Sequence, residues 1–271
     1  MANKVEWLEI SEINEGLKHN SYGTNTDLAG REEVLTFADG AKVTYKFDAE
    51  DVTRIENYEI QSAAYKCIKI DDNLYLAWFR QPANKANQTL VLIDYSSNQA
   101  TEFYGIMPTL DEAKCDLITM AFTEFSCTRV KLEYKSASLN GAAVKPIERT
   151  NEIVGNRVRW TYSEQDIYEH IYLNPNFYSW QCLEGPEKGL ADTDHCDYFK
   201  LRDKLYLFVW REKLVPTMGF IATNYRNGND ALQSNGTLFG INTTTGAPEG
   251  GEIVGAKGQL INYTDNNRFF G

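Results

Sequence analysis

The sequence is poor in the residues that build metal and disulfide sites. It has only three histidines and five cysteines, and no two cysteines are spaced as a CxxC pair. This pattern argues against a disulfide framework or a structural zinc site, and it is typical of a reducing compartment. We therefore expect a cytoplasmic protein with unpaired cysteines at Cys67, Cys115, Cys127, Cys182 and Cys196.

Long apolar runs and a basic excess are also missing. No stretch approaches the roughly 20 apolar residues of a membrane-spanning helix, and the opening MANKVEWLEISEINEG has no signal-like apolar core. The formal net charge is −11, whereas nucleic acids and anionic membranes are bound through basic surfaces. We expect neither as a partner.

Aromatic residues are plentiful instead, at 13% of the chain, which favours strands over helical bundles. Alternating runs meet at hairpin signals such as Asp39-Gly40 and Asn140-Gly141. Helical spacing is confined to two places. One is residues 5–17, with Ser11 as the expected cap and Glu15 in the first turn, and the other is a helix or connector at 108–120.

The two halves of the chain share a pattern. DNLYLAWFRQ at 72–81 is matched by DKLYLFVWRE at 203–212, and residues 65–81 align without a gap on 196–212. Further matches keep their order, among them TLVLI at 89–93 with TMGFI at 217–221. This order indicates a tandem duplication of one all-β unit of ordinary domain size.

Many short strands with frequent turns predict a sandwich or a closed barrel. In LYLFVWRE both faces are apolar, as expected if one face lines a cavity and the other is covered by a neighbour. We predict an all-β fold of two tandem lipocalin-like antiparallel β-barrels packed together, with a short N-terminal helix. The predicted domains are residues 1–120 and 121–271, and the second carries the ligand site.

The second half holds the chemistry-bearing residues. Tyr168, His170 and Tyr172 share one strand face, and an aromatic pocket with few polar groups is typical of a small-molecule site. The alternative is an ordinary aromatic core with a satisfied histidine. The predicted substrate-binding residues are Tyr168, Tyr172, Trp180, Cys182, Tyr198, Phe208 and Trp210.

His170 is the candidate acid or base, with Glu212 or Lys200 orienting it, because burial shifts such groups toward useful pKa values. A structural ion pair of Glu212 with Arg211 or Lys213 is the alternative. Cys182 would be a nucleophile only beside a base, and a plain buried cysteine is the competing interpretation.

Metal and cofactor signals are weak. LADTDHC contains Asp192, Asp194, His195 and Cys196, but neighbouring side chains of an extended segment point in opposite directions. There is no GxGxxG, P-loop or HExxH motif, and GAPEGGEIVGAKG is best explained as a loop. We expect no metal and no cofactor.

Three stretches resemble the MoaF family, whose members are labelled molybdenum cofactor biosynthesis protein F. They are DLAGREEVLTFADGAKVTYKF, YEHIYLNPNFYSWQCLEGPEKGLADTD and LYLFVWREKLVPTMGF. The resemblance covers both halves and implies two lipocalin-like barrels. It supplies no catalytic residues, and barrels of this kind serve carriers and enzymes alike.

The first functional hypothesis is a cofactor-free enzyme of the lyase, isomerase or cyclase type. It would act on a small apolar or aromatic molecule by positioning and proton transfer. The second is a non-catalytic binding or accessory protein of the MoaF type. A third is a homodimeric scaffold whose barrels are filled.

Overall fold

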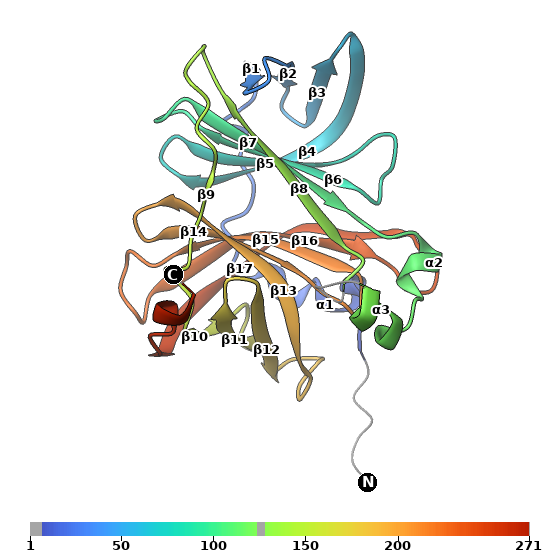
Figure 1. The fold of residues 1–271 in the computed structure, drawn as a ribbon, viewed down its shortest axis with the longest axis vertical. Helices are drawn as coiled ribbons and strands as arrows, with labels where there is room; N and C mark the ends of the chain where they lie inside the picture. The colour runs from blue at the N-terminus through green and yellow to red at the C-terminus, as the bar shows by residue number, and fades with distance from the viewer. Residues whose placement is uncertain (1–6, 124–127, 271) are drawn as a thin grey trace. The chain divides into compact units, whose positions relative to one another are not determined.

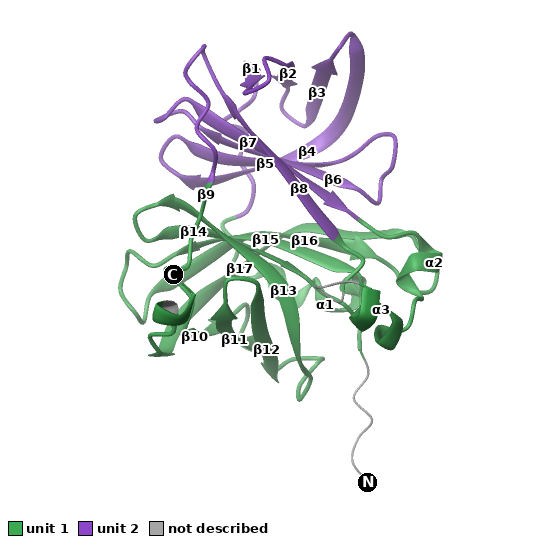
Figure 2. Ribbon diagram, in the orientation of Figure 1, with its two compact units in different colours: residues 1–22, 107–130, 148–271 green, residues 23–106, 131–147 purple. Residues whose placement is uncertain are grey.

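The computed structural model describes residues 7–123 and 128–270, which form two compact units (Figures 1 and 2). Residues 23–106 and 131–147 make up one unit, called the N-terminal barrel below. Residues 148–270 form the C-terminal barrel, and residues 7–22 and the described part of 107–130 belong to the same unit.

The N-terminal barrel is closed and antiparallel, because its last strand pairs with both its first and its seventh. The Asp39-Gly40 hairpin joins β1 to β2 as predicted, with Gly40 at φ 83°. The strands are β1 (Glu32–Phe37), β2 (Lys42–Phe47), β3 (Asp51–Glu56), β4 (Glu59–Asp71), β5 (Leu74–Arg80), β6 (Gln88–Asp94), β7 (Gln99–Ile106) and β8 (Lys131–Ser138).

The C-terminal barrel is closed by pairing of β10 with β17 and of β12 with β13, while the short β9 adds to β13. Its strands are β9 (Glu148–Arg149), β10 (Asn156–Thr161), β11 (Ile167–Asn174), β12 (Phe177–Glu184), β13 (Ala191–Arg202), β14 (Leu205–Arg211), β15 (Thr217–Asn224), β16 (Leu232–Ile241) and β17 (Pro248–Tyr263). The predicted fold class, two tandem antiparallel barrels, is confirmed.

The duplication is visible in the backbone. The β4–β5 and β13–β14 pairs each shift register before the hairpin, between Lys69 and Asp71 and between Lys200 and Arg202. The turns that follow each contain a residue with positive φ, Asn73 at 58° and Lys204 at 53°. The two halves therefore repeat both the strand order and the local irregularities.

The division of the chain differs from the predicted one at residue 120. Strand β8 lies after that point, yet it closes the N-terminal barrel through its pairing with β1 and β7. The first described residues, 7–22, belong instead to the unit of the C-terminal barrel. Strand pairing decides the assignment of β8, because an open barrel edge would leave backbone hydrogen-bonding groups unpaired.

The helices are short. The predicted opening helix is α1 (Ile10–Ile13), followed by a 3₁₀ helix at Gly16–Lys18, and the connector contains α2 (Leu110–Ala113) and α3 (Leu117–Thr123). A last 3₁₀ helix covers Asn267–Phe269. No helix among the described residues is long and apolar enough to cross a membrane.

The predicted cap of the opening helix was wrong. Glu9 is the N-cap residue and its backbone N–H donates to Glu12 at 2.8 Å. Ser11 lies inside α1, where its hydroxyl donates to Glu249 at 3.2 Å, and Glu15 follows the helix. Ser11 thus anchors the helix to the barrel and does not cap it.

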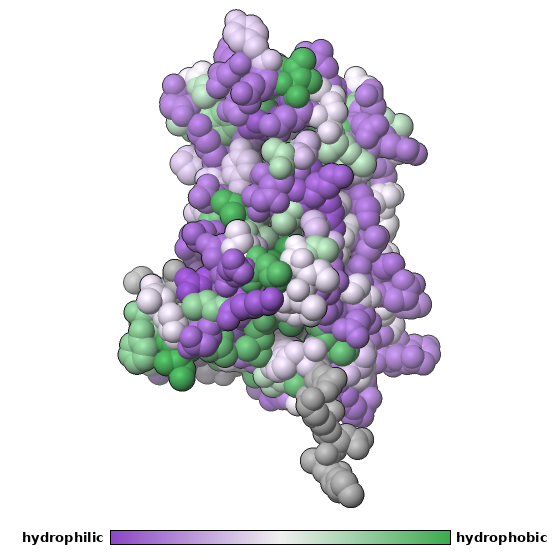
Figure 3. Space-filling model, turned by 90° about the vertical axis from the view of Figure 1, so that its right-hand side faces the viewer, coloured by the Kyte–Doolittle hydropathy of each residue, from purple (hydrophilic) through white to green (hydrophobic). Residues whose placement is uncertain are grey.

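Apolar side chains are concentrated inside the barrels, whereas hydrophilic side chains cover much of the face in Figure 3. Of the predicted free cysteines, Cys67, Cys182 and Cys196 are buried free thiols and Cys115 is a half-buried one. Cys127 lies outside the described residues, as do Val5 of the predicted helix and residues 124–127 of the region predicted to return to strands. The packing of one barrel against the other stays a prediction.

Candidate functional site

Aromatic side chains fill the interior of the C-terminal barrel. Alternation along β14 turns Tyr206, Phe208 and Trp210 inward. The Phe208 ring stacks on Tyr198 and Trp210, with centroid distances of 5.6 and 5.2 Å. Such pairs contribute about 0.5–1.5 kcal/mol each beyond the area they bury, so they form a well-packed inner wall.

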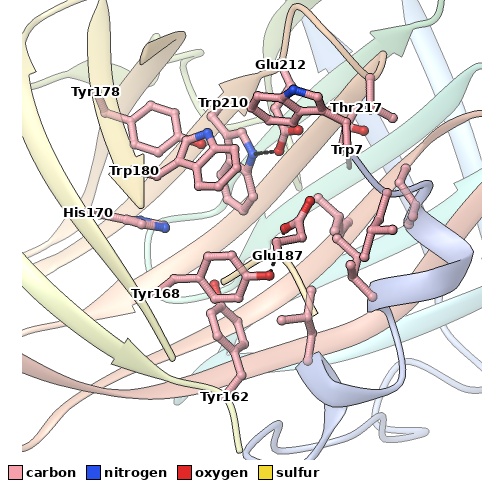
Figure 4. A pocket seen from close by; sticks show the side chains of 16 residues that line it. Trp7, Tyr162, Tyr168, His170, Tyr178, Trp180, Glu187, Trp210, Glu212 and Thr217 are labelled. Carbon is pink, nitrogen blue, oxygen red and sulfur yellow. Dashed lines mark hydrogen bonds between the residues drawn. The ribbon is translucent and has the colours of Figure 1, made fainter. Parts of the chain in front are cut away.

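A cavity of about 50 Å³ lies beside Trp210 and is lined by further aromatic rings, among them Tyr168, Tyr178 and Trp180 (Figure 4). Since one water needs about 10–15 Å³ by this measure, it has room for only a few waters. Its walls come from five strands of the barrel, the loops that follow β10, β12 and β14, and the N-terminal segment (residues 7–17). The lining side chains are Trp7, Leu8, Ile10, Ile13, Leu17, Tyr162, Tyr168, His170, Tyr178, Trp180, Glu187, Trp210, Glu212, Val215, Thr217 and Leu238.

A smaller space of about 10 Å³ continues into the barrel. Tyr162, His170 and Trp210 border both spaces. The other residues around the inner space are Trp160, Tyr172, Phe208, Ile221, Thr223 and Ser234. Tyr172 is fully buried and accepts the indole N–H of Trp160 at 3.2 Å, so this end is a closed, hydrogen-bonded floor.

Two carboxyl groups reach the cavity from different elements. Glu212 follows β14 and accepts the indole N–H of Trp210 at 3.0 Å, while Glu187, in the loop after β12, accepts the phenol O–H of Tyr168 at 2.8 Å. Burial raises the pKa of both carboxyls, and for Glu212 the nearby Asp194 raises it further, well above the ordinary range. A raised pKa favours the protonated form, so Glu212 is the candidate proton donor of this cavity.

Two further polar groups at the cavity have no hydrogen-bond partner. Nδ1 of His170 and the hydroxyl oxygen of Thr217 are buried and unpaired in the structure. Burial lowers the pKa of His170 to about 3, so its ring is neutral. Buried polar groups are usually hydrogen-bonded, so two unpaired ones beside the same cavity indicate a place for a ligand's polar atoms.

A second polar cluster holds the Trp180 side of the cavity wall in place. The indole N–H of Trp180 donates to Asp194 at 3.0 Å, and Lys213 pairs with Asp192 and, at 3.6 Å, with Asp194. Burial raises the pKa of Asp194 to about 6 even with Lys213 beside it. These contacts fix the Trp180 ring against the cavity.

The N-terminal segment forms the remaining wall. Trp7 meets Trp180 edge-on at 5.7 Å between ring centroids, and Ile10 is fully buried in the barrel's hydrophobic cluster. Glu9 accepts the backbone N–H of Thr243 at 3.0 Å, which ties the segment to the turn after β16. Because Trp7 is still 38% exposed, it lies at the mouth of the cavity.

Only some of the predicted substrate-binding residues line one of the two spaces. Tyr168, Trp180 and Trp210 line the main cavity, and Tyr172 and Phe208 line the inner space. Cys182 and Tyr198 are buried in the same cluster and border neither space. The Cys182 thiol donates to the backbone oxygen of Glu184 at 3.3 Å, and burial raises its pKa to about 11, so it is a poor nucleophile.

The predicted orientation of His170 by Glu212 or Lys200 is not what the structure contains. Glu212 is bonded to Trp210, and Lys200 pairs with Glu152. Lys200 has the inward parity of its strand, but it lies opposite Tyr206, about 13 Å along β14 from Trp210. The sequence pattern could not indicate at which end of the barrel Lys200 lies.

Several lining residues were not predicted. Tyr178 shares the strand face of Trp180, so alternation could have identified it. Tyr162 and Glu187 come from loops, and Thr217 begins a strand that showed only apolar periodicity. The local sequence around Trp7 and Ile10 gave no indication that they line this cavity, because the barrel begins over 100 residues later.

Neighbouring side chains of the LADTDHC stretch point to opposite faces of β13, as expected for a strand. Cys196 belongs to the interior cluster, and His195 contacts Arg211 instead. Within the described residues no group of three or more His, Cys, Asp or Glu side chains is arranged to hold a metal ion.

The sequence comparisons agree with this architecture. The MoaF N-terminal domain model matches residues 5–109, and the MoaF C-terminal domain model matches residues 147–264. The chain belongs to the MoaF family. It is 27% identical to Protein MoaF of Klebsiella aerogenes over 266 residues, which are 97% of this chain and 98% of that protein. In this MoaF-family chain the matched C-terminal domain supplies the barrel strands of the cavity.

Proposed function

We propose that the C-terminal barrel binds a small apolar or aromatic molecule and acts on it by acid/base chemistry of the lyase, isomerase or cyclase type. The single observation that carries the proposal is the set of incompletely paired polar groups around a ring-lined cavity. His170 and Thr217 have unpaired buried atoms there, and Glu212, whose pKa is raised, lies in the same lining.

Glu212 is the best-placed proton donor. Its uncharged carboxyl can give a proton to a basic atom of the substrate and recover one as the product forms, so the step has no net proton change. His170, with its pKa lowered to about 3, is a weak base and serves better as a hydrogen-bond partner. The acid role therefore belongs to Glu212 in this proposal and not to His170.

The cavity walls supply the other part of catalysis, which is positioning. Trp180 is fixed by Asp194 and Trp210 by Glu212, so both rings are held in one orientation. A flat apolar substrate between them would be presented to Glu212 in a restricted set of poses.

The second candidate is a binding or accessory protein without catalysis. It is favoured by the absence, among the described residues, of a hydrogen bond joining His170 to Glu212 or Glu187. A carrier needs only the rings and the unpaired polar atoms, which are present.

The family label suggests a ligand related to the molybdenum cofactor, and the cavity does not fit one. Molybdate and phosphorylated pterins are anions, whereas the lining contains Glu187 and Glu212 and, among its described residues, no Lys or Arg. An anion there would meet two acidic groups without a compensating charge. The proposed reaction therefore involves no molybdenum or pterin group.

The test is native mass spectrometry of the protein purified from its source, with chemical identification of any co-purified molecule. Wild type is compared with Glu212→Gln and with Glu184→Gln, a control at the exposed end of β12. An enzyme gives conversion of the identified molecule by wild type and the control, and binding without conversion by Glu212→Gln. Binding without conversion in all three identifies a carrier, and no bound molecule in any of them argues against both candidates.

A further inference from the structure

The polar groups of the C-terminal cavity also restrict the charge of its ligand, an inference that rests on the proposed function. Glu187 and Glu212 contribute carboxyl oxygens to the lining of the cavity. The N–H of Trp210 and the O–H of Tyr168 donate to these carboxyl groups. A carboxyl oxygen can accept more than one hydrogen bond, so a ligand with its own donors suits this lining.

The ionisable groups of the lining also favour a cationic ligand. Glu187 and Glu212 line the cavity, and its described lining contains no Lys or Arg. The nearest basic group of the acidic cluster behind the wall, Lys213, is already paired with Asp192 and Asp194. Entry of a positive charge would be favourable, and entry of a negative charge would not.

The rings suit a cation as well as an apolar body. Trp7, Trp180, Trp210, Tyr168 and Tyr178 surround the space, and Trp180 lies 6.1 Å from Tyr168 and 5.7 Å from Trp7 between ring centroids. Aromatic faces attract ammonium groups through their quadrupoles, most strongly where water is excluded. Figure 4 shows the rings and the two carboxyl groups around the same space.

The unpaired atoms complete the match. A primary ammonium group has three N–H donors and no acceptor. The two carboxyls, the Thr217 hydroxyl and the neutral His170 ring provide more acceptors than it needs, and the last two have buried atoms without partners. This arrangement satisfies donors better than it would satisfy the oxygens of a carboxylate or phosphate.

We propose that the C-terminal barrel selects a small organic cation, namely a primary amine on an aromatic or apolar body, whose ammonium group is held by Glu187 and Glu212. The body of the amine packs against Trp180 and Trp210. Burial raises the pKa of both carboxyl groups in the ligand-free site, and an ammonium group bound beside them would lower it again, because a nearby opposite charge favours the carboxylate.

The N-terminal segment must yield to a ligand of this size. A cavity of about 50 Å³ is smaller than a phenyl ring requires, and Trp7, at the mouth, is the most exposed of the cavity's large apolar side chains. Trp7→Ala should therefore admit the probe more readily, which makes this variant a useful second host for binding measurements.

The experiment compares three probes that share a phenyl body: 2-phenylethylamine, 2-phenylethanol and 3-phenylpropionate. Binding is measured by tryptophan fluorescence and calorimetry on wild type and Trp7→Ala. We expect the amine to bind about tenfold or more tightly than the alcohol, from charge-assisted hydrogen bonds and cation–π contacts, and the carboxylate to bind most weakly.

Two variants test whether the charge of the carboxyl groups, and not the shape of the cavity, determines amine binding. Glu187→Gln and Glu212→Gln should each weaken the amine about tenfold and the alcohol much less, because only the cation uses the carboxylate charge. Alcohol binding close to that of wild type also shows that each variant is folded. The control Glu184→Gln should bind all three probes as wild type does, since Glu184 pairs with Lys188 at the exposed end of β12.

The outcomes distinguish the two proposals. If the alcohol binds as tightly as the amine, or the carboxylate binds most tightly, the cation proposal is overturned while the small-molecule site stands. If no probe binds to wild type or to Trp7→Ala, both are overturned.

Discussion

The two barrels treat buried carboxyl groups differently. In the N-terminal barrel Glu102 is 1% exposed and accepts hydrogen bonds from Tyr45 and Tyr104, with Arg54 3.4 Å away. Arg54 also donates to the Tyr45 oxygen at 3.1 Å. Every group in this cluster has partners, and a guanidinium balances the charge. In the C-terminal barrel Glu187 accepts from Tyr168 and Glu212 accepts from Trp210, and within the described part of the chain neither carboxyl forms an ion pair.

The duplicated positions sharpen the contrast. Gln81 and Thr89 of the N-terminal barrel correspond to Glu212 and Thr217, and there the Gln81 amide donates to the Thr89 hydroxyl at 3.2 Å. In the C-terminal barrel the threonine is unpaired and the glutamate turns to Trp210. One copy has satisfied its polar pair internally, and the other has left it facing a cavity. The two copies share a strand pattern, and the candidate site lies in the copy whose threonine lacks a hydrogen-bond partner within the barrel.

Breaking the N-terminal cluster should have the largest effect. Glu102→Gln leaves the Arg54 guanidinium without its most buried partner, and loss of one member of a buried ion pair costs about 3–5 kcal/mol. We expect a clear fall in the free energy of unfolding by urea titration. Glu56→Gln, which removes the more exposed partner of Arg54, should cost much less. Equal losses in the two variants would contradict a buried cluster centred on Glu102.

The pH dependence of His170 should be next in size. Its pKa, about 3 in the folded protein, lies below the ordinary value of 6.5, so the unfolded chain takes up a proton first as pH falls. Stability is therefore complete above about pH 6.5 and falls below it, by about 2 kcal/mol at pH 5.

His170→Gln should lose this part of the pH dependence, as measured by thermal melts from neutral pH downward. His19→Gln, at an exposed histidine before the first barrel, is the control. An unaltered slope in His170→Gln would mean that this ring titrates normally.

Converting the site toward its counterpart should change stability in the opposite direction. Glu212→Gln installs the residue found at Gln81. Because the pKa of Glu212 is raised in the folded state, the wild type loses stability as pH rises above the unfolded value, by about 1.4 kcal/mol for each pH unit over which the folded state alone keeps the proton.

The variant lacks this loss, so it should be more stable than wild type at pH 8 and the gain should shrink toward pH 5. The groups that influence Glu212 are Asp192, Asp194, Glu187, Tyr162 and Tyr178, and all of them remain in the variant. Melts at the two pH values measure the difference, and a destabilised variant at pH 8 would show that Glu212 is charged and well solvated. A gain in stability together with weaker amine binding would be the expected trade-off of a functional residue.

Much of the architecture followed from local patterns in the sequence. Period-2 alternation gave the strands and the faces of Tyr168, Trp180 and Trp210, and the ordered matches between the halves gave two copies of one barrel. These features depend on neighbouring residues and on strand geometry, which the sequence displays directly.

The tertiary structure decided what alternation cannot express. It showed which end of the barrel each inward residue occupies, so Lys200 lies with Glu152 while Trp210 lies at the cavity. It also showed that the N-terminal segment supplies a wall to a barrel far along the chain, and that β8 returns to close the first barrel. Faces are set by local backbone geometry, whereas closure and site assembly depend on long-range pairing, for which the local pattern contains no information.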